Sequence, residues 1–538
     1  MDIHSARLLL SGNEAVALSA LHHHVALGTG YPGTPSTEIL ENFSRFGGRA
    51  QWAPNEKVAA EVAVGASLAG ARAICTMKHV GVNVAADPLF TLAYTGVEGA
   101  LVVVTADDPG MASSQKEQDN RYYARAAGIP MLEPADSQEA YDFLARALDL
   151  AEQFGIPVFL RMTTRICHSK TIVRPSGAVP AKPAAPVFRH NVRHRVMIPV
   201  NARPAHKRLR DKLAAVAEWN EGSPLNEVVE GSRDLGIITS GVAYQHVREA
   251  APDASVFKVG LSYPLPIEAL RKFAAGVTRC VVIDEGENIL ASDLRAAGID
   301  VEGKPARYRF GELNAPRVRR ILDGDESKEP AAAKGTPPQL CPGCPHRKVF
   351  AALRDRACIV AGDIGCYSLG ALPPFEAMDT CLCMGASIGV GLGLRHVLPD
   401  EQAVKVVSVI GDSTFVHSGI TGLVEAVYNP PATGHVVIVL DNDTTAMTGL
   451  QEHPGTGRRL DHSTTHRVAI EDVARAVGFP RVAVVDPVGD NPAWLAALDE
   501  ALASRTPCLI VARRPCVLSA KKQAQLARSG ACSEGEKS

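Results

Sequence analysis

Residues 406–412 read VVSVIGD and residues 436–444 read VVIVLDNDT, and these two stretches decide the fold of the last third of the chain. Each begins as an apolar run, which is typical of a buried strand, and each ends abruptly in residues that carry oxygen atoms. The segment between them, TFVHSGITGLVEAVYN (414–429), has the apolar spacing of a helix. Such a strand–helix–strand unit binds its ligands at the carboxyl edge of a parallel sheet.

Asp412 and Asn442 directly follow the two predicted strands, so we expect their side chains at that edge. With the backbone carbonyl of Thr444 they supply the oxygen ligands that Mg²⁺ prefers, and Mg²⁺ fills its remaining positions with phosphate oxygens. The arrangement resembles the thiamine-diphosphate motif, which begins Gly-Asp-Gly and closes with Asn. Gly411 and Asp412 match that motif, whereas Ser413 replaces its third residue.

The same alternation of short apolar runs and helical segments recurs along the chain and predicts an α/β protein with three doubly wound domains. A Pro-rich, basic stretch after the first domain indicates an extended crossing segment and a short helix, although its charges could instead bind an acidic partner. The predicted segments are a first domain at 1–170, the crossing segment at 171–230, a second domain at 231–325, a linker at 326–337, a third domain at 338–516 and a polar tail at 517–538.

Composition limits the class of function. The chain has 538 residues, 46% of them hydrophobic, and a net charge of −2, which favours neither a nucleic acid nor a membrane surface as partner. No apolar stretch reaches membrane-spanning length, and the N-terminus lacks the pattern of a secretory signal. We therefore expect a cytoplasmic enzyme, in which the 12 cysteines serve metal or redox chemistry rather than disulfides.

Four cysteines are candidate metal ligands. Cys341 and Cys344 lie in the Pro/Gly turn CPGC, Cys366 in GDIGCYSLG and Cys516 in ARRPC. Four thiolates suit a [4Fe–4S] cluster, but a structural zinc site that uses His346 fits the spacing equally well. A second pair, in MDTCLCMG, precedes the Gly-rich turn that opens at Gly385 and is expected to line a diphosphate pocket.

Two residues of the first domain are candidates for catalysis. Glu56 lies at the start of a long Ala/Gly-rich helix, where burial would raise its pKa; the alternative is an ordinary first-turn glutamate stabilised by the helix dipole. Thr34, in the rigid loop YPGTPS, could bind a substrate carboxylate or simply belong to the turn. Further polar residues could line the same cleft or meet substrate: Lys78, His79, Asp107, Asp108, Gln115, Arg121, His417 and His453.

Taken together, the motifs resemble the thiamine-dependent 2-oxoacid:ferredoxin oxidoreductases, and within them the large (alpha) subunit of the indolepyruvate enzymes. The resemblance covers the chain to about Cys516. The stretches that carry it are YPGTPSTE, NEKVAAEVAVGASLAGARA, TMKHVGVNVAADP, ADDPGMASSQKEQDNR, CPGCPHR, GDIGCYSLGALPP, MDTCLCMGASIGVG and GDSTFVHSGITGL with DNDTTAMTG.

The resemblance implies a pyrimidine-binding domain at 1–170, a transketolase-C-like domain at 231–325 and a diphosphate-binding domain at 338–516, with thiamine diphosphate between the first and the third. It implies that Glu56 activates the aminopyrimidine and that Thr34 faces the substrate. Met447 stands where related pyruvate enzymes have Asn, which implies a more apolar pocket and a bulkier substrate. The resemblance also implies the Mg²⁺ ligands Asp412, Asn442 and Thr444, and the [4Fe–4S] ligands Cys341, Cys344, Cys366 and Cys516.

The implied reaction is oxidative decarboxylation of an aryl-2-oxoacid to an acyl-coenzyme A. The implied partners are a separate small beta subunit that helps to bind coenzyme A, in an alpha2beta2 assembly, and ferredoxin or another electron carrier. Alpha subunits of the family commonly carry a C-terminal ferredoxin-like domain, which the printed sequence does not contain, so we expect electrons to pass from one cluster to a separate protein. The alternatives are a non-oxidative thiamine-dependent decarboxylase and a catalytically silent scaffold with zinc at the CxxC.

Overall fold

The computed structural model describes residues 5–175, 183, 185–329 and 338–519. These residues form two compact units, divided after residue 331, within the segment predicted to be a linker. Both units are of the α/β class, which confirms the predicted fold class. We describe each unit by itself.

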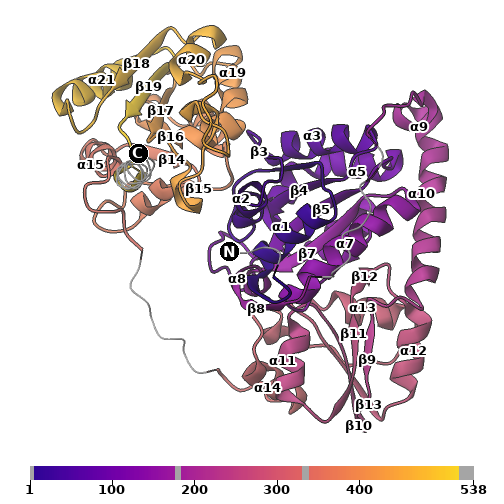
Figure 1. Cartoon of the computed structure of the whole chain (residues 1–538). Coiled ribbons are helices and arrows are strands. Elements are labelled where there is room, and N and C mark those ends of the chain that lie inside the picture. The colour runs from indigo at the N-terminus through magenta and orange to yellow at the C-terminus, as the bar shows by residue number, and fades with distance from the viewer. Residues whose placement is uncertain (1–4, 176–182, 184, 330–337, 520–538) are drawn as a thin grey trace, which may run out of the picture. The chain divides into compact units, whose positions relative to one another are not determined.

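A seven-stranded sheet forms the centre of the first unit (Figure 1). Six of its strands run parallel, and one edge strand pairs antiparallel with β6. That edge strand comes from residues 261–263, so a segment of the second predicted domain completes the sheet of the first. In spatial order the strands are β12 (Leu261–Tyr263), β6 (Met131–Leu132), β7 (Val158–Thr163), β5 (Leu101–Asp107), β4 (Ala73–Lys78), β2 (Leu27–Gly30) and β3 (Ala50–Trp52).

The inner strands β4, β5 and β7 are buried almost throughout, because helices cover both faces of the sheet. A two-stranded antiparallel ribbon of β1 (Leu8–Ser11) and β8 (Lys170–Val173) lies beside this layer. The helices are α1 (Gly12–His22), α2 (Thr37–Arg45), α3 (Glu56–Leu68), α4 (His79–Val84), α5 (Ala86–Thr95), α6 (Arg121–Ala127), α7 (Ser137–Phe154) and α8 (Thr164–His168).

The crossing segment holds a longer helix than the short one expected. After α9 (Val192–Arg195), helix α10 (Pro199–Asn220) has 22 residues and runs along one side of the unit (Figure 1). Its buried residues Leu209, Leu213 and Val216 recur at helical spacing. This apolar stripe supports the helix although Pro204 lies inside it.

A smaller four-stranded sheet completes the first unit. Its strands are, in order, β13 (Arg279–Ile283), β10 (Ser232–Ser240), β11 (Ala254–Val259) and β9 (Glu227–Val229), with β9 antiparallel to β11. One face packs on α12 (Ile267–Ala275) and α13 (Ile289–Ala296), and the other on α11 (Ala243–Ala250) and α14 (Ala315–Leu322). The short helix η1 (Ala306–Tyr308) precedes α14.

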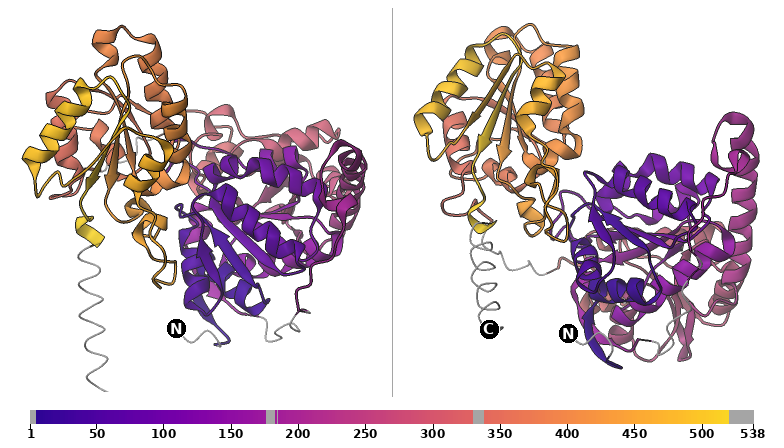
Figure 2. Two further views of the ribbon diagram at one scale, coloured as in Figure 1. Left: turned by 90° about the horizontal axis from the view of Figure 1, so that it is seen from above. Right: turned by 45° about the horizontal axis from the view of Figure 1, so that its top comes forward.

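The second unit is a parallel six-stranded sheet between two layers of helices (Figure 2). Its strand order is β15 (Thr380–Cys381), β14 (Ile359–Gly362), β16 (Val406–Gly411), β17 (Val436–Asp441), β19 (Cys508–Arg513) and β18 (Arg481–Val485). One core contains α15 (His346–Asp355) and α21 (Asn491–Ala503), and the other α16 (Ala386–Val397), α19 (Ile420–Tyr428) and α20 (Ile470–Val477). The short helices are η2 (Cys366–Ala371), α17 (Asp400–Ala403), α18 (Asp412–Thr414), the π-helical turn η3 (Phe415–Gly419), η4 (Ala446–Thr448) and η5 (Pro454–Thr456).

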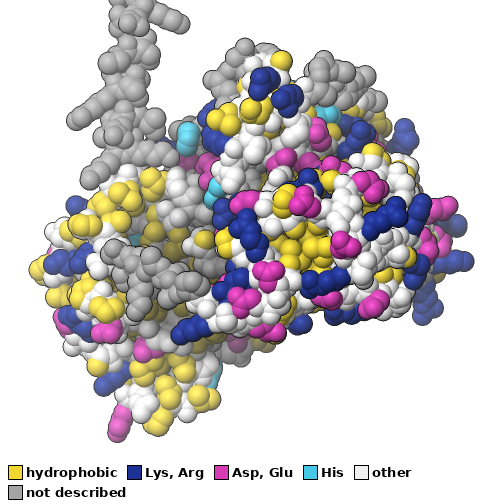
Figure 3. Space-filling view, turned by 90° about the horizontal axis from the view of Figure 1, so that it is seen from below, with side chains coloured by type: hydrophobic (Ala, Val, Ile, Leu, Met, Phe, Trp, Pro, Cys, Tyr) yellow, Lys and Arg dark blue, Asp and Glu magenta, His cyan; other side chains and the backbone are white. Residues whose placement is uncertain are grey.

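Basic and acidic side chains are interspersed over the face of the molecule drawn in Figure 3, with hydrophobic side chains between them. Among the described residues, no helix is both long and apolar enough to cross a membrane.

Candidate active site

The second unit brings the two halves of the thiamine motif together. Strands β16 and β17 are parallel neighbours in register, with Gly411 opposite Leu440. Asp412 and Asn442 therefore follow adjacent strand ends, and the backbone N–H of Asn442 donates to Asp412 Oδ2 at 3.2 Å. Thr444 N–H donates to Asn442 Oδ1 at 3.2 Å. Asp412, Ser413, Asn442 and Thr444 are all buried, as expected of a preformed ligand site.

Asp412 is held in its ionised form. Burial by itself would raise the pKa of Asp412, but the nearby His453 ring and the Ser413 N–H outweigh burial and lower that pKa. His453 Nε2 lies 3.3 Å from Asp412 Oδ2, while its Nδ1 accepts the Gly455 N–H, so Nε2 carries the proton. The neutral ring thus points its N–H at the Asp412 carboxylate. This buried anion with oxygen neighbours fits a site for Mg²⁺.

The CPGC turn reaches the same strand ends. His346, two residues after Cys344, lies with its Nε2 3.4 Å from the Asn442 side-chain nitrogen. Burial lowers the pKa of His346 to about 4, so the neutral ring accepts a hydrogen bond from the Asn442 amide. Cys516 N–H donates to the Asn442 carbonyl at 2.9 Å. Segments separated by much of the unit's sequence therefore meet around Asn442.

The four candidate cluster cysteines lie within electrostatic reach of one another. Burial, with the charges of Cys516, Cys344 and Cys341, raises the pKa of Cys366 to about 11. In the parts of the chain that the structure describes, no three His, Cys, Asp or Glu side chains already stand as a metal site. The structure thus brings the four cysteines near one another without a formed metal site, and their role as ligands of a metal ion or cluster stays a prediction.

The Asp363 carboxylate binds the backbone of the turn before α16. Asp363 accepts hydrogen bonds from Gly385 N–H at 2.9 Å and from Ser387 N–H at 3.0 Å. Gly385 has φ +86°, and a Cβ there would lie 2.4 Å from Ser418 Cβ, so this turn requires glycine. Cys381 and Cys383 are exposed on the strand side of the turn, and Cys381 Sγ donates to the Asp363 carbonyl at 3.5 Å.

The remaining candidates of this unit lie near the same edge. His417 is buried in η3, where its Nδ1 contacts Ser418 Oγ at 2.5 Å. Met447 lies in η4 and is 49% exposed, so its side chain is available to a ligand. His453, a candidate substrate contact from the sequence, instead pairs with Asp412.

In the first unit, Glu56 begins α3 and is buried. The helix starts there because the Asn55 side chain accepts the Val58 N–H at 2.9 Å. Gly81 lets the Glu56 carboxyl pack against α4, since a Cβ at that position would lie 2.6 Å from Glu56 Oε1. Glu56 is thus a buried carboxyl on a rigid helix start, as the activation of a bound base requires.

Thr34 follows β2 and is half-buried in the loop that packs on Lys78. Lys78 ends β4 and donates to the Ser113 carbonyl at 2.7 Å, and burial lowers the pKa of Lys78 to about 8. Asp108 accepts hydrogen bonds from Ser113, Ser114 and Thr164. Gln115 is exposed, away from these buried contacts.

Arg121 has a structural role. Its buried guanidinium pairs with Asp119 and with Asp284, which follow strands of the two different sheets. Sequence reasoning missed Arg161, a buried arginine inside the apolar run of β7 that pairs with Asp107 and Glu133. The signal was present, because a charged residue in a fully apolar strand requires buried partners.

Two family models match parts of this chain. Residues 363–512 match the family model "Thiamine pyrophosphate enzyme, C-terminal TPP binding domain". Residues 19–203 match "Pyruvate flavodoxin/ferredoxin oxidoreductase, thiamine diP-bdg".

Three curated relatives are named indolepyruvate oxidoreductase subunit IorA. The protein of Archaeoglobus fulgidus is 41% identical over 90% of this chain and 83% of its own length. The protein of Methanothermobacter thermautotrophicus is 40% identical over 90% of this chain and 84% of its own length. The protein of Pyrococcus abyssi is 39% identical over 97% of this chain and 87% of its own length.

A solved structure has a similar fold. It is the 2-oxoglutarate:ferredoxin oxidoreductase of Magnetococcus marinus, solved with 2-oxoglutarate, coenzyme A and succinyl-CoA bound. The TM-score is 0.52 at 19% identity, over 60% of this chain and 65% of that one.

Proposed function

The chain belongs to the family of indolepyruvate oxidoreductase subunits IorA, and on that premise we propose that it oxidatively decarboxylates indolepyruvate or another arylpyruvate. It is the catalytic subunit of a thiamine-diphosphate-dependent 2-oxoacid:ferredoxin oxidoreductase. The 2-oxoacid and coenzyme A give an acyl thioester, CO₂, one proton and two electrons.

Roles toward thiamine diphosphate are assigned here to residues of each unit by itself. Asp412, Asn442 and the Thr444 carbonyl bind Mg²⁺, which anchors the diphosphate, and Gly385 opens the turn that receives it. Glu56 would hydrogen-bond the aminopyrimidine of bound thiamine diphosphate and would hold a proton there. Bound thiamine diphosphate supplies the nucleophilic carbon and the electron sink for decarboxylation. The buried Glu56 and the ionised Asp412 support this division of roles.

The residues proposed to meet substrate are Thr34 in the first unit and His417 and Met447 in the second. Thr34 donates a hydrogen bond to the 2-oxoacid carboxylate from the loop that packs on Lys78. Met447 offers a flexible apolar wall to an aromatic ring. His417, whose Nδ1 contacts Ser418 Oγ, would donate or accept a proton at the substrate. This apolar side supports an arylpyruvate over pyruvate.

Cys341, Cys344, Cys366 and Cys516 hold a [4Fe–4S] cluster in this proposal. A cluster bound there would supply one-electron transfer to ferredoxin or another carrier. The relatives are named as subunits, which supports a separate beta subunit that contributes to coenzyme A binding in an alpha2beta2 assembly.

The observation that carries the proposal is the meeting of both motifs at Asn442. Its backbone N–H binds the Mg²⁺ candidate Asp412, its carbonyl accepts the Cys516 N–H, and its side chain contacts His346 of the CPGC segment. One residue thus links the diphosphate anchor to two segments of the cysteine group.

The test is metal analysis and activity of anaerobically purified protein, co-expressed with its beta subunit. We expect about four irons per chain and a brown colour, with indolepyruvate-dependent reduction of ferredoxin that requires coenzyme A and thiamine diphosphate. Colourless protein with zinc would contradict the cluster. Release of an aldehyde without acceptor reduction would identify a non-oxidative decarboxylase instead.

A further inference from the structure

Lys78, in the first unit, lies at the carboxyl end of β4 and beside two groups that the proposed function uses. The stem of Lys78 packs so closely on the loop of Thr34 that a Cβ added at Gly33 would lie 2.9 Å from Lys78 Cβ and 3.8 Å from its Cδ. Shortly after Lys78, Gly81 packs on the Glu56 carboxyl, and a Cβ added there would lie 2.6 Å from Glu56 Oε1. The short segment from Lys78 to Gly81 therefore contacts both the loop proposed to meet substrate and the carboxyl proposed to bind the aminopyrimidine.

Hydrogen bonds fix the backbone that carries Lys78. In the sheet, Lys78 is paired in register with Ala106 of the neighbouring strand β5. The carbonyl of the next residue, His79, accepts hydrogen bonds from the side chains of Gln118 at 3.0 Å and Asn120 at 3.1 Å. When an anion binds, only the Lys78 side chain has to be ordered, which keeps the entropic cost of binding low.

The ammonium group of Lys78 keeps N–H donors for a ligand. It has three donors, and one of them binds the Ser113 carbonyl at 2.7 Å. Within the described part of the chain, the other donors have no acceptor and Lys78 forms no ion pair. The side chain is half-buried, so part of it is accessible, and burial lowers the pKa of Lys78 to about 8. A bound anion would offset the cost of holding this partly buried positive charge.

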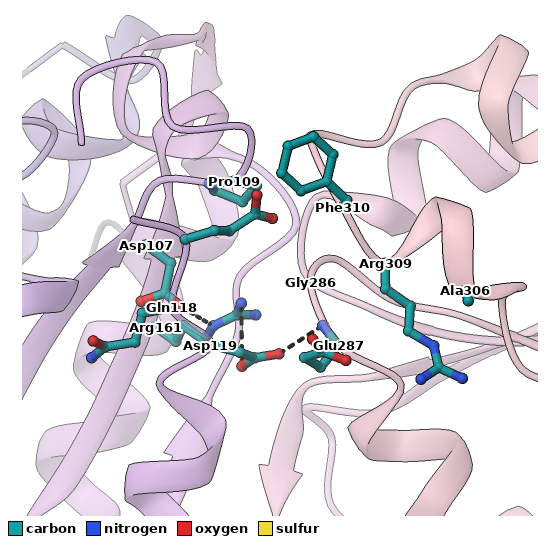
Figure 4. Close-up of a pocket in the computed structure, with 11 residues that line it drawn as sticks. Asp107, Pro109, Gln118, Asp119, Arg161, Gly286, Glu287, Ala306, Arg309 and Phe310 are labelled. Carbon is teal, nitrogen blue, oxygen red and sulfur yellow. Dashed lines mark hydrogen bonds and ion pairs between the residues drawn. The ribbon is translucent and has the colours of Figure 1, made fainter. Parts of the chain in front are cut away.

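The two carboxyl groups at the end of β5, the strand beside β4, have partners of their own. Asp107 pairs with Arg161 of β7, with 2.7 Å between the two side chains (Figure 4). Asp108 accepts hydrogen bonds from backbone and hydroxyl donors of Ser113, Ser114 and Thr164. Asp108 therefore acts on Lys78 only through its charge, which raises the pKa of Lys78 against the effect of burial. The ammonium is thus left for the anion of a ligand.

We propose that Lys78, together with Thr34, binds the carboxylate of the 2-oxoacid. This inference rests on the proposed function and assigns the positive charge that the negative group of the substrate needs there. An ammonium–carboxylate pair shielded from water is stronger than the hydrogen bond of the Thr34 hydroxyl alone. Because the carboxylate loses its charge as CO₂ leaves, the pair is strongest with the intact substrate. Lys78 should therefore set the affinity for the 2-oxoacid and change the rate of the chemical step little.

The first test is steady-state kinetics of the assembled enzyme with the 2-oxoacid that the wild type uses at the lowest KM. Lys78→Met, which keeps the apolar stem, should raise KM at least about 30-fold and change kcat less than about threefold. Lys78→Arg, which keeps the charge, should stay within about fivefold of the wild-type KM. Lys116→Met removes an exposed lysine in the loop after β5 and should behave as wild type. An unchanged KM in Lys78→Met would overturn the assignment.

The second test resolves the charge of the bound group. Indole-3-lactate keeps the carboxylate but has a hydroxyl in place of the reacting carbonyl, and indole-3-lactamide has nearly the same shape without the charge. In calorimetric titrations of the wild type loaded with thiamine diphosphate, the lactate should bind at least about tenfold more tightly than the lactamide. Lys78→Met should bind the two within about threefold of each other. A preference for the lactate that persists in Lys78→Met would contradict the inference.

Further outcomes separate this inference from the proposed function. A wild type that turns over no 2-oxoacid would overturn the proposed function, and this inference with it. An active wild type whose Lys78→Met variant loses thiamine diphosphate, but still prefers the lactate, would assign Lys78 to the cofactor and overturn this inference alone. Equal melting temperatures of Lys78→Met and wild type exclude a folding defect. If Lys78→Met melts lower, Lys78→Gln, which keeps an N–H donor for the Ser113 carbonyl, takes its place in both tests.

Discussion

At the scale of single residues, neighbouring groups shift the pKa values of two buried carboxyl groups in opposite directions. Asp412 stays ionised because His453 faces it in a buried site. Glu285, equally buried, accepts a single backbone N–H from Leu313, and burial raises its pKa to about 7. The first environment suits a metal ligand, and the second makes a carboxyl that titrates near neutral pH.

Substitution of Glu56 should impair catalysis, whereas substitution of Asp412 should impair cofactor binding. Glu56→Gln should bind thiamine diphosphate with Mg²⁺ nearly as wild type but lose at least about 100-fold in kcat, because the amide cannot hold the proton of the carboxyl. Asp412→Asn should lose at least about tenfold in affinity for the cofactor, because an anionic metal ligand is gone. Cofactor titration and acceptor-reduction assays check both, and full activity of Glu56→Gln would remove that residue from the mechanism.

Glu285 should make the stability of the first unit depend on pH. The pKa of Glu285 in the folded protein is about 7, above its ordinary value of 4.5. The contribution of the protonated carboxyl to the free energy of unfolding is therefore complete below pH 4.5 and is lost as the pH rises through 7. Between about pH 5 and about pH 8, the free energy of unfolding of the wild type should fall by about 2–3 kcal/mol more than that of Glu285→Gln. The glutamine keeps an acceptor for the Leu313 N–H. Calorimetric melting checks this, with exposed Glu268→Gln as control. Parallel pH curves for wild type and Glu285→Gln would contradict the assignment.

At the scale of elements, the ends of the strands set the positions of the candidate residues. The carboxyl ends of β16 and β17 carry Asp412 and Asn442, and those of β2, β4 and β5 carry the loops of the first unit. The sequence predicted these ends because each apolar run stops at a polar residue. It could not predict that β12 adds to the first sheet, since three residues carry no periodicity of their own.

The turn into α16 offers a matched pair of glycine substitutions. Gly385→Ala should destabilise the second unit by about 2 kcal/mol or more, because φ +86° is strained for alanine and its Cβ would collide with Ser418. Gly393→Ala, inside α16 with open space around it, should be neutral or stabilise by about 0.5–1 kcal/mol. Chemical denaturation of the two variants checks the difference. Equal stabilities would show that the turn tolerates a side chain.

At the scale of the whole molecule, the sequence predicted the α/β class and the thiamine-diphosphate fold, because motifs with fixed chemistry occur in order along the chain. It did not predict that His346 and Cys516 meet Asn442. It missed the pairing of His453 with Asp412 and the salt bridges of Arg121 and Arg161. Those contacts join residues as far apart as Arg121 and Asp284. A charged residue in an apolar strand, such as Arg161, indicates that it has buried partners, but a single sequence does not say which residues they are. The size of helix α10 was also missed, since the prolines at its start indicated an extended chain.

Substitution of Cys516 tests whether distant segments of the chain form one metal site. Its backbone is fixed on Asn442, and its charge acts on Cys344 and Cys366. Cys516→Ser should therefore lose most of the about four irons expected per chain and the visible absorption of the cluster. Cys383→Ser, an exposed thiol of the same unit, should keep both. Because serine preserves the backbone bond to Asn442, loss of iron in Cys516→Ser with an unchanged melting temperature would identify the sulfur as a ligand. Full iron content in Cys516→Ser would mean that the cluster, if present, is held without it.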